Sequence, residues 1–181
     1  MTAARQPTLT SARLVLRPLG PDDVAHMATL DGDPAVMRYI IGRPRTDAEV
    51  RERLDQYLAV SRAGPLGCWT VWDRAGDAFV GIGLLKPIDD RVEIEVGYRL
   101  HQTAWGHGYA TELTRRLLAY GFDDVGLEEI VAVVDPDNAA SQRVIEKAGL
   151  ARAGVLAAYG RDDLVFSRLD RSGWAALTAR G

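Results

Sequence analysis

The sequence predicts a single α/β domain in which helices flank a mixed central β-sheet on both faces. Residues 92–100 alternate apolar side chains with polar residues or glycine, which is the period-two pattern of a half-buried strand. Residues 130–134 are continuously apolar, as expected of a central strand that is covered on both faces. Segments with helical periodicity alternate with such strands, and a chain of 181 residues suits one domain of ordinary size.

The first half of the chain is expected to hold two helices among short strands. Pro21 suits the first turn of a helix, where its missing N–H group is not needed. Thr46 and Glu49 have the spacing of a capping box, so a longer helix is predicted to begin there and to end near Gly64. The strands predicted in this half cover residues 13–17, 69–72 and 79–85.

The second half is expected to contain two helices, each preceded by a strand, and a final pair of strands. A glycine-rich segment, 105–111, follows the period-two strand, and a helix is predicted to begin near Gly108. Asn138 can cap a second helix after the continuous apolar strand, and Gly149 can close it. The residues expected on the inward face of this helix are Ala140, Val144, Ile145 and Ala148. The last strands are placed at 155–159 and 164–169, and the domain at 9–177 after a short tail, 1–8.

Composition argues against several classes of function. The chain has 22 basic and 25 acidic residues and a formal charge of −3, whereas nucleic-acid binding favours a basic surface. Cys68 is the only cysteine, so neither an intramolecular disulfide nor a cysteine-built metal site is expected. Residues 1–12 lack the apolar run of a signal peptide, and no apolar run approaches the ~20 residues of a membrane helix. We expect a cytoplasmic protein that binds no metal, nucleic acid or membrane.

The segment around Gly106 and Gly108 is a candidate anion site. The two glycines allow a tight turn and leave space for a ligand near the main chain. Free N–H groups of the following helix then point into that space, where the helix dipole favours a phosphate or pyrophosphate. Loops of this composition are more often plain turns, and this one is neither a P-loop nor a GxGxxG fingerprint. Nucleotide binding through the same loop stays an alternative.

Three longer motifs place this loop in a family context. They are Trp105–Glu112 (WGHGYATE), Asp135–Ser141 (DPDNAAS) and Val144–Leu150 (VIEKAGL). Together they closely resemble the GNAT superfamily of acetyl-CoA-dependent N-acetyltransferases, and within it the branch of ribosomal-protein N-terminal (alanine/serine) acetyltransferases. The segments Thr10–Pro18 and Glu95–Tyr98 resemble the same branch. The resemblance spans residues 9–177 and implies a single-domain GNAT-type fold with acetyl-CoA as co-substrate.

The resemblance also implies which residues bind acetyl-CoA. Main-chain amides of the glycine loop would hold the pyrophosphate, and the residues concerned are Gly106, His107, Gly108, Tyr109, Ala110 and Thr111. Tyr98 and Leu100 would line the pantetheine arm, which such proteins bind like an additional strand. Asn138 would hydrogen-bond the arm and Ser141 would lie near the sulfur, although Asn138 also suits a helix cap and Ser141 a first helical turn. The His107 side chain is more simply an exposed loop histidine than a phosphate ligand.

The implied reaction is direct attack of a primary amine on the acetyl thioester, which needs a neutral amine and donors for the oxyanion. A bulge at Gly97 would free the Tyr98 amide to be such a donor. Glu95 and Glu93 are the candidate bases, because carboxylates are costly in a central strand unless they are paired or used. Ion pairs with Arg99 or another arginine are the alternative. Strict alternation puts both carboxylates on the face opposite Tyr98.

One position departs from the family pattern. The Tyr that often protonates the leaving thiolate aligns with Ile145, so we expect Ser141 to substitute, since a thiolate of pKa near ~8.5 needs little acid help. The same departure supports a second hypothesis, a non-catalytic acyl-CoA-binding sensor or interaction module. For an enzyme, a protein or peptide N-terminal amine is the favoured acceptor, and a small-molecule amine is the alternative. Small proteins of this branch are often dimers, which makes a homodimer possible.

Overall fold

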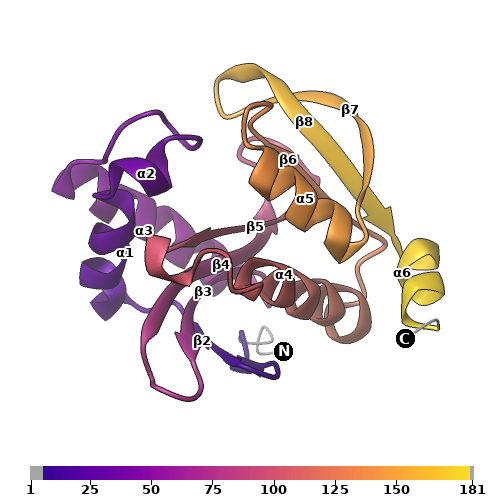
Figure 1. The fold of residues 1–181 in the computed structure, drawn as a ribbon, viewed down its shortest axis with the longest axis horizontal. Helices are drawn as coiled ribbons and strands as arrows, with labels where there is room; N and C mark the ends of the chain where they lie inside the picture. Colours follow the sequence, from indigo (N-terminus) through magenta and orange to yellow (C-terminus); the bar gives the residue numbers. More distant parts are fainter. Residues whose placement is uncertain (1–5, 180–181) are drawn as a thin grey trace.

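The computed structural model describes residues 6–179, which form one sheet of eight strands with helices on both faces (Figure 1). The strands are β1 (Leu9–Thr10), β2 (Leu14–Pro18), β3 (Gly67–Asp73), β4 (Phe79–Pro87), β5 (Ile94–Leu100), β6 (Glu129–Val134), β7 (Ala151–Ala158) and β8 (Arg161–Asp170). The α-helices are α1 (Val24–Asp31), α2 (Pro34–Met37), α3 (Asp47–Ala63), α4 (Tyr109–Ala119), α5 (Ala139–Ala148) and α6 (Arg171–Thr178). None of these helices is long and apolar enough to cross a membrane, within the residues described.

The sheet is mixed, as the sequence predicts. Its strand order is β1-β2-β3-β4-β5-β6-β8-β7, and neighbouring strands are antiparallel except β5 and β6, which are parallel. Of the expected tail, residues 1–5 lie outside the described part of the chain. The next residues already contact the sheet, because the Pro7 carbonyl accepts a hydrogen bond from the Trp69 indole at 2.9 Å.

The predicted helices and strands occur in the predicted order, with β1, α2 and α6 in addition. β1 and α2 have two and four residues, too short for periodicity to mark them. The capping box of α3 is confirmed, and Asn138 and Gly149 cap α5 at its two ends as predicted. The inward placement of Ala140 is wrong: its side chain is exposed, because the buried face of α5 begins at Ile145.

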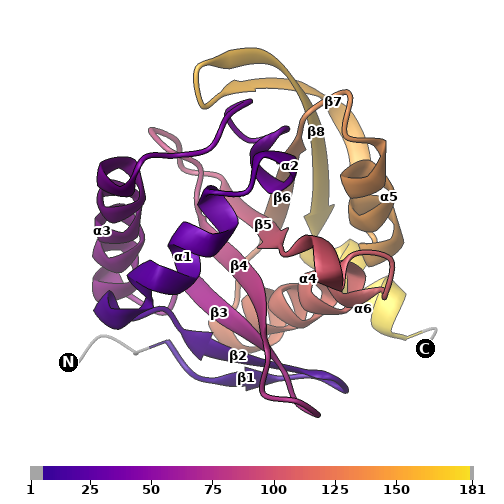
Figure 2. The ribbon, with the colours of Figure 1, turned by 60° about the vertical axis from the view of Figure 1, so that its left-hand side comes forward.

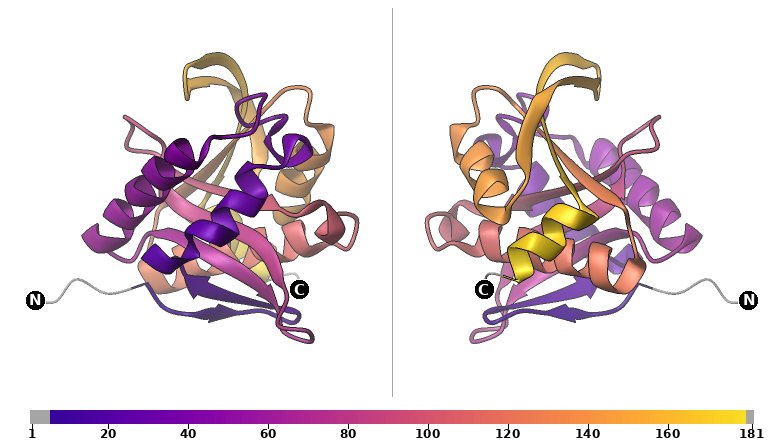
Figure 3. Two further views of the ribbon diagram at one scale, coloured as in Figure 1. Left: turned by 90° about the vertical axis from the view of Figure 1, so that its left-hand side faces the viewer. Right: turned by 90° about the vertical axis from the view of Figure 1, so that its right-hand side faces the viewer.

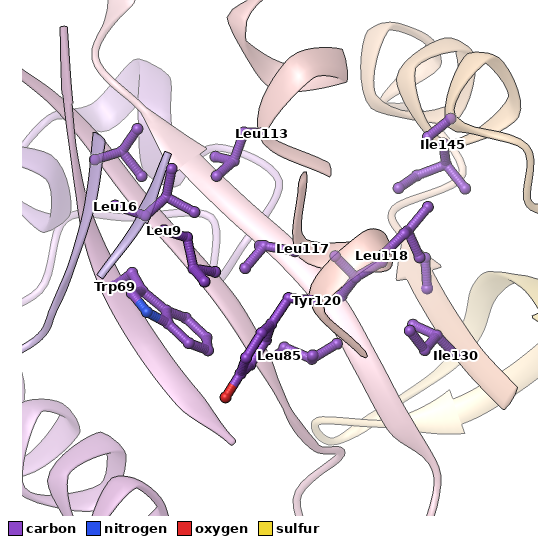
Figure 4. Packing of buried hydrophobic residues seen from close by; sticks show 14 of the residues in the cluster. Leu9, Leu16, Trp69, Leu85, Leu113, Leu117, Leu118, Tyr120, Ile130 and Ile145 are labelled. Atoms are coloured by element: carbon purple, nitrogen blue, oxygen red, sulfur yellow. The ribbon is translucent and has the colours of Figure 1, made fainter. Parts of the chain in front are cut away.

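Helices α1 and α3 cover one face of the sheet, and α4 and α5 cover the other (Figures 2 and 3). On the α4 face, the buried side chains include Leu85, Leu113, Leu117, Tyr120 and Ile130 (Figure 4). On the α1–α3 face, they include Met27, Leu30, Leu54, Tyr57 and Ile82. Residues of β5 alternate between the two faces: Glu95 and Arg99 lie on the α1–α3 side, whereas Val96 and Tyr98 lie on the α4 side.

The sheet separates between β5 and β6. These two strands share one register pair, Glu95 with Val131, whereas β5 pairs with β4 along its whole length. Toward Leu100 and Val134 the edges of β5 and β6 are therefore not paired with each other. The register of β4 with β5 runs through Gly97 without a shift, so the predicted bulge at Gly97 is wrong.

The alternating direction of the peptide groups along β5, and not a bulge, turns the Tyr98 amide away from β4. The His101 amide donates to the Val80 carbonyl at 3.0 Å in the antiparallel register of β4 and β5. In such a pair only every second residue exchanges hydrogen bonds with the neighbouring strand. The peptide groups of Val96, Tyr98 and Leu100 therefore face away from β4, toward β6. At Tyr98 this direction leads into the unpaired region, so the separation of the strands leaves its N–H group accessible.

Candidate active site

The glycine loop has the conformation expected of an anion site. Gly106 and Gly108 both have φ of +79°, in the left-handed region that favours glycine. Helix α4 begins at Tyr109, and no side chain in the described part of the chain caps it. The first-turn N–H groups, those of Tyr109, Ala110 and Thr111, therefore point outward with the positive end of the helix dipole.

Arg13 and Glu112 fix this loop against the start of β2. The Glu112 carboxylate accepts hydrogen bonds from the Ser11 hydroxyl, the Arg13 amide and the Arg13 Nε, each at 2.7 Å. The Arg13 guanidinium also donates to the His107 carbonyl at 2.9 Å and lies 4.7 Å from the centre of the Tyr109 ring. The sequence does not single out Arg13, because its place beside the loop depends on pairing across the fold. The His107 side chain is exposed, as expected.

The side chains of Tyr98, on β5, and Ser141, on α5, contact each other. The Tyr98 hydroxyl lies 3.0 Å from the Ser141 hydroxyl, and burial raises the pKa of Tyr98. The Ser141 amide donates to Asn138 Oδ1 at 3.0 Å, so the predicted cap is confirmed. Leu100 is buried, and its carbonyl accepts a hydrogen bond from the Trp105 indole at 2.9 Å. Ile145 lies in the core at 3% exposure.

Glu95 lies on the opposite face of the sheet from Tyr98, as strict alternation predicts. Its side chain is 8% exposed and contacts Lys86 Nζ at 3.0 Å. The Tyr159 hydroxyl donates a hydrogen bond to the same carboxylate oxygen. Burial raises the pKa of Glu95, and the Lys86 charge opposes this shift.

The arginine partners proposed from the sequence are partly wrong. Glu95 pairs with a lysine of β4, because Lys86 is its direct cross-strand neighbour. Arg99 pairs instead with the fully buried Asp31 of α1, at 3.1 Å. Glu93 precedes β5 and forms an ion pair with Arg91 at 2.7 Å, which lowers the pKa of Glu93. Glu93 is thus a paired carboxylate in a turn, and it does not join Glu95.

A shallow groove of about 400 Å³ is lined by Tyr159, whose hydroxyl contacts Glu95. It is lined by the segment 38–42 after α2 and by Tyr159 and Arg161 at the tip of the β7–β8 hairpin. Figure 2 shows this hairpin reaching over the sheet toward the loop that follows α2.

Comparison with known proteins gives a consistent result. Residues 13–151 match the acetyltransferase (GNAT) domain. The FsC-acetyl coenzyme A-N(2)-transacetylase of Aspergillus fumigatus is 35% identical over 162 residues, which cover 83% of this chain and 67% of that protein. The uncharacterized N-acetyltransferase p20 of Bacillus licheniformis is 30% identical over 172 residues, which cover 91% of this chain and 97% of that protein.

Solved structures agree at the level of the fold. The spermidine N-acetyltransferase of Vibrio cholerae, in complex with CoA and spermine, superposes with a TM-score of 0.74 at 22% identity. The superposition covers 91% of this chain and 99% of that one. The predicted fold class is therefore confirmed.

Proposed function

The chain belongs to the GNAT family of acetyl-CoA-dependent N-acetyltransferases, and on that premise we propose that its acceptor is a primary amine that attacks the thioester directly. A protein or peptide N-terminal amine is the favoured acceptor, and a small-molecule amine is second. The observation that carries the proposal is one junction of the fold. There Tyr98, at the unpaired edge of β5, contacts Ser141. The uncapped start of α4 follows β5 in the chain, after the glycine loop.

The described residues fit acetyl-CoA. The uncapped N–H groups at the start of α4 suit its pyrophosphate, and the Nη2 group of Arg13 beside Gly108 adds a further donor. The unpaired edge of β5 offers main-chain groups to the amides of the pantetheine arm, as a sheet edge does to an added strand. Asn138 uses its Oδ1 for the helix cap, so its Nδ2 is the group that can donate to the arm.

The reacting thioester then lies at the separation between β5 and β6. The Tyr98 N–H group is our donor to the carbonyl oxygen, because it faces this space without a partner strand. The Tyr98 and Ser141 hydroxyls are our donors to the leaving sulfur. The family's usual tyrosine is absent at Ile145, but Tyr98 supplies a phenol to the site from β5.

Glu95 is our base, and the chemistry of the acceptor sets what it must do. An α-amine has a pKa of ~7.7–8.0, against ~10.4 for a lysine side chain, so it loses its proton far more easily near neutral pH. A buried carboxylate that acts through an intermediate group suffices for such an amine. This favours an N-terminal amine over a lysine side chain as the acceptor.

A thiol-release assay with an acceptor panel tests the proposal. Acetyl-CoA is supplied with peptides that have free N-termini, with polyamines and with aminoglycosides, and amine-dependent release of CoA is followed. We expect release with the peptides. Release with polyamines or aminoglycosides alone would replace the favoured acceptor by a small amine. Tight acetyl-CoA binding without release from any amine would contradict the proposed acceptor chemistry.

Ser141→Ala and Tyr98→Phe are each expected to lower kcat by about 10-fold while acetyl-CoA still binds. The loss is below the ~10²–10⁴-fold typical of essential acid–base groups, because a thiolate is already a tolerable leaving group. Ser172→Ala is the matched control, since the Ser172 hydroxyl contacts Asp170 at the start of α6. An unchanged kcat in both site variants would contradict the roles given to the pair.

A further inference from the structure

The base proposed above is separated from the reacting thioester. Glu95 points to the α1–α3 face of the sheet and is 6% exposed, whereas Tyr98 and Ser141 lie on the α4 and α5 face. Its Oε1 atom contacts Lys86 Nζ and the Tyr159 hydroxyl. Of these two groups, only Tyr159 also lines the groove beside the sheet.

Tyr159 occupies an unusual position for an aromatic residue. The β7–β8 hairpin closes with Ala158 opposite Arg161, so Tyr159 and Gly160 are the two central residues of its turn. Their φ angles are +55° and +72°, both in the left-handed region. Asn, Asp and Gly are the residues that this type of turn favours, and a tyrosine is strained there. The turn aims the Tyr159 ring back onto the sheet, with 38% of the residue still exposed.

The hydrogen bonds of the Tyr159 hydroxyl leave one acceptor position free. A phenol donates one hydrogen bond through its O–H group and accepts others at its oxygen. Its donor goes to Glu95, and one acceptor position takes the Lys86 ammonium at 2.9 Å. The remaining acceptor position is on the Tyr159 oxygen, and Tyr159 is one of the residues that line the groove.

We propose that Tyr159 is the proton relay between the acceptor amine in the groove and the carboxylate of Glu95. This inference rests on the proposed function and adds the groove as the acceptor site. The ammonium form of the acceptor gives a proton to the Tyr159 oxygen while the Tyr159 hydroxyl proton moves to Glu95. The neutral amine then attacks, so that the C–N bond forms and the C–S bond breaks.

The protons balance over one turnover. The second proton of the attacking nitrogen is the one that the departing thiolate gains, passed on through the Tyr98 and Ser141 hydroxyls. The proton on Glu95 returns to solvent past Lys86, whose ammonium lies 3.0 Å from both Glu95 and Asp89. Asp89 is 44% exposed and also pairs with Arg53 of α3 at 3.0 Å. Glu95, Lys86, Asp89 and Arg53 thus lie around the Tyr159 hydroxyl, and Arg38 and Arg161 line the groove together with Tyr159.

The pKa directions agree with this arrangement. Burial raises the pKa of Glu95 above its ordinary value, which makes its carboxylate a stronger base. Burial and the neighbouring Glu95 charge raise the pKa of Tyr159. The phenol therefore stays protonated and can exchange one proton for another without ionising.

The test is the pH profile of kcat/KM for Tyr159→Phe with the peptide acceptor. The variant keeps the ring and removes the hydroxyl. We expect a loss of about 10²-fold at pH 7, within the range for a positioned acid–base group. The loss should shrink above the pKa of the acceptor amine, because the free amine then needs no relay. Acetyl-CoA affinity should not change.

Two further variants separate a relay from a structural role. Tyr120→Phe removes another phenol hydrogen bond, the one that the Tyr120 hydroxyl donates to the Pro65 carbonyl at 3.0 Å, and should keep the wild-type pH profile. Glu95→Gln should reproduce the profile of Tyr159→Phe. The double variant Glu95→Gln/Tyr159→Phe should lose little more than either single variant, because both act on one path.

Each outcome decides between the claims. A wild type that releases CoA, with Tyr159→Phe matching it at every pH, would overturn the relay alone. A loss in Tyr159→Phe that is equal at all pH values would also overturn it, since a structural defect does not follow the protonation of the amine. A wild type without amine-dependent release would overturn the proposed function and the relay together.

Discussion

Replacing Asp31 with asparagine is expected to lower the free energy of unfolding by about 3–5 kcal/mol, the range for breaking a buried ion pair on one side. The Asp31 carboxylate is fully buried at the end of α1 and contacts Arg99 at 3.1 Å and Arg45 at 2.8 Å. The two guanidinium groups are themselves 5% and 9% exposed, so they stay buried without their counter-charge. Urea unfolding followed by tryptophan fluorescence measures the loss.

Asp77→Asn is the matched control for this substitution. Asp77 also pairs with an arginine, Arg17, at 2.7 Å, but their side chains are 73% and 46% exposed. Exposed pairs contribute ~0–1 kcal/mol, so the control should unfold close to the wild type. Asparagine also suits the left-handed backbone of Asp77, where φ is +48°. Equal losses of unfolding free energy at the two positions would show that burial does not set the contribution of the Asp31 ion pairs.

The elements that the sequence predicts are those whose signals are local. The capping box at Thr46, the cap at Asn138 and the period-two pattern of β5 each depend on a few neighbouring residues. The motifs of the glycine loop are equally local, and the structure gives that loop the left-handed glycines and uncapped helix that an anion needs. Fold class and the conformation of the glycine loop could therefore be predicted.

The partners of the charged side chains could not be predicted in the same way. Lys86 pairs with Glu95 because β4 and β5 align in one register, and Asp31 meets Arg99 because α1 packs on that face of the sheet. Tyr159 reaches Glu95 only because a hairpin turn folds it back across the sheet. These contacts join residues that are far apart in the chain, so no spacing in the sequence marks them.

The Tyr98 amide shows how an unpaired N–H group can have a different cause from the one predicted. The bulge at Gly97 that the sequence predicts would free this N–H group, but the register excludes that bulge. The structure frees it by ending the pairing of β5 with β6 after Glu95. Whether two parallel strands separate depends on what packs against both, and a single strand sequence does not contain that information.

Gly108→Val is expected to weaken acetyl-CoA binding by about 10²-fold, equal to two tenfold steps of ~1.4 kcal/mol each. Gly108 has φ of +79°, where an L-residue is less stable by roughly 1–2 kcal/mol and a β-branched one is a steric outlier. The nearest atom to a Cβ at Gly108 is Arg13 Nη2 at 3.5 Å, so the fold itself has room for it. We expect the added carbons to occupy space in front of the α4 N–H groups, because Gly108 directly precedes that helix. Isothermal titration with acetyl-CoA measures the effect.

Gly126→Val controls for the backbone strain in that experiment. Gly126 has φ of +83°, and a Cβ there would lie 3.7 Å from the Nη2 atom of another arginine, Arg171. The two glycines therefore match in conformation and in nearest neighbour, but Gly126 ends the helical turn that follows α4 and lies away from the glycine loop. Both variants should lose similar stability, and only Gly108→Val should lose acetyl-CoA affinity. Equal affinity losses in the two would mean that strain, and not the space at the start of α4, weakens binding.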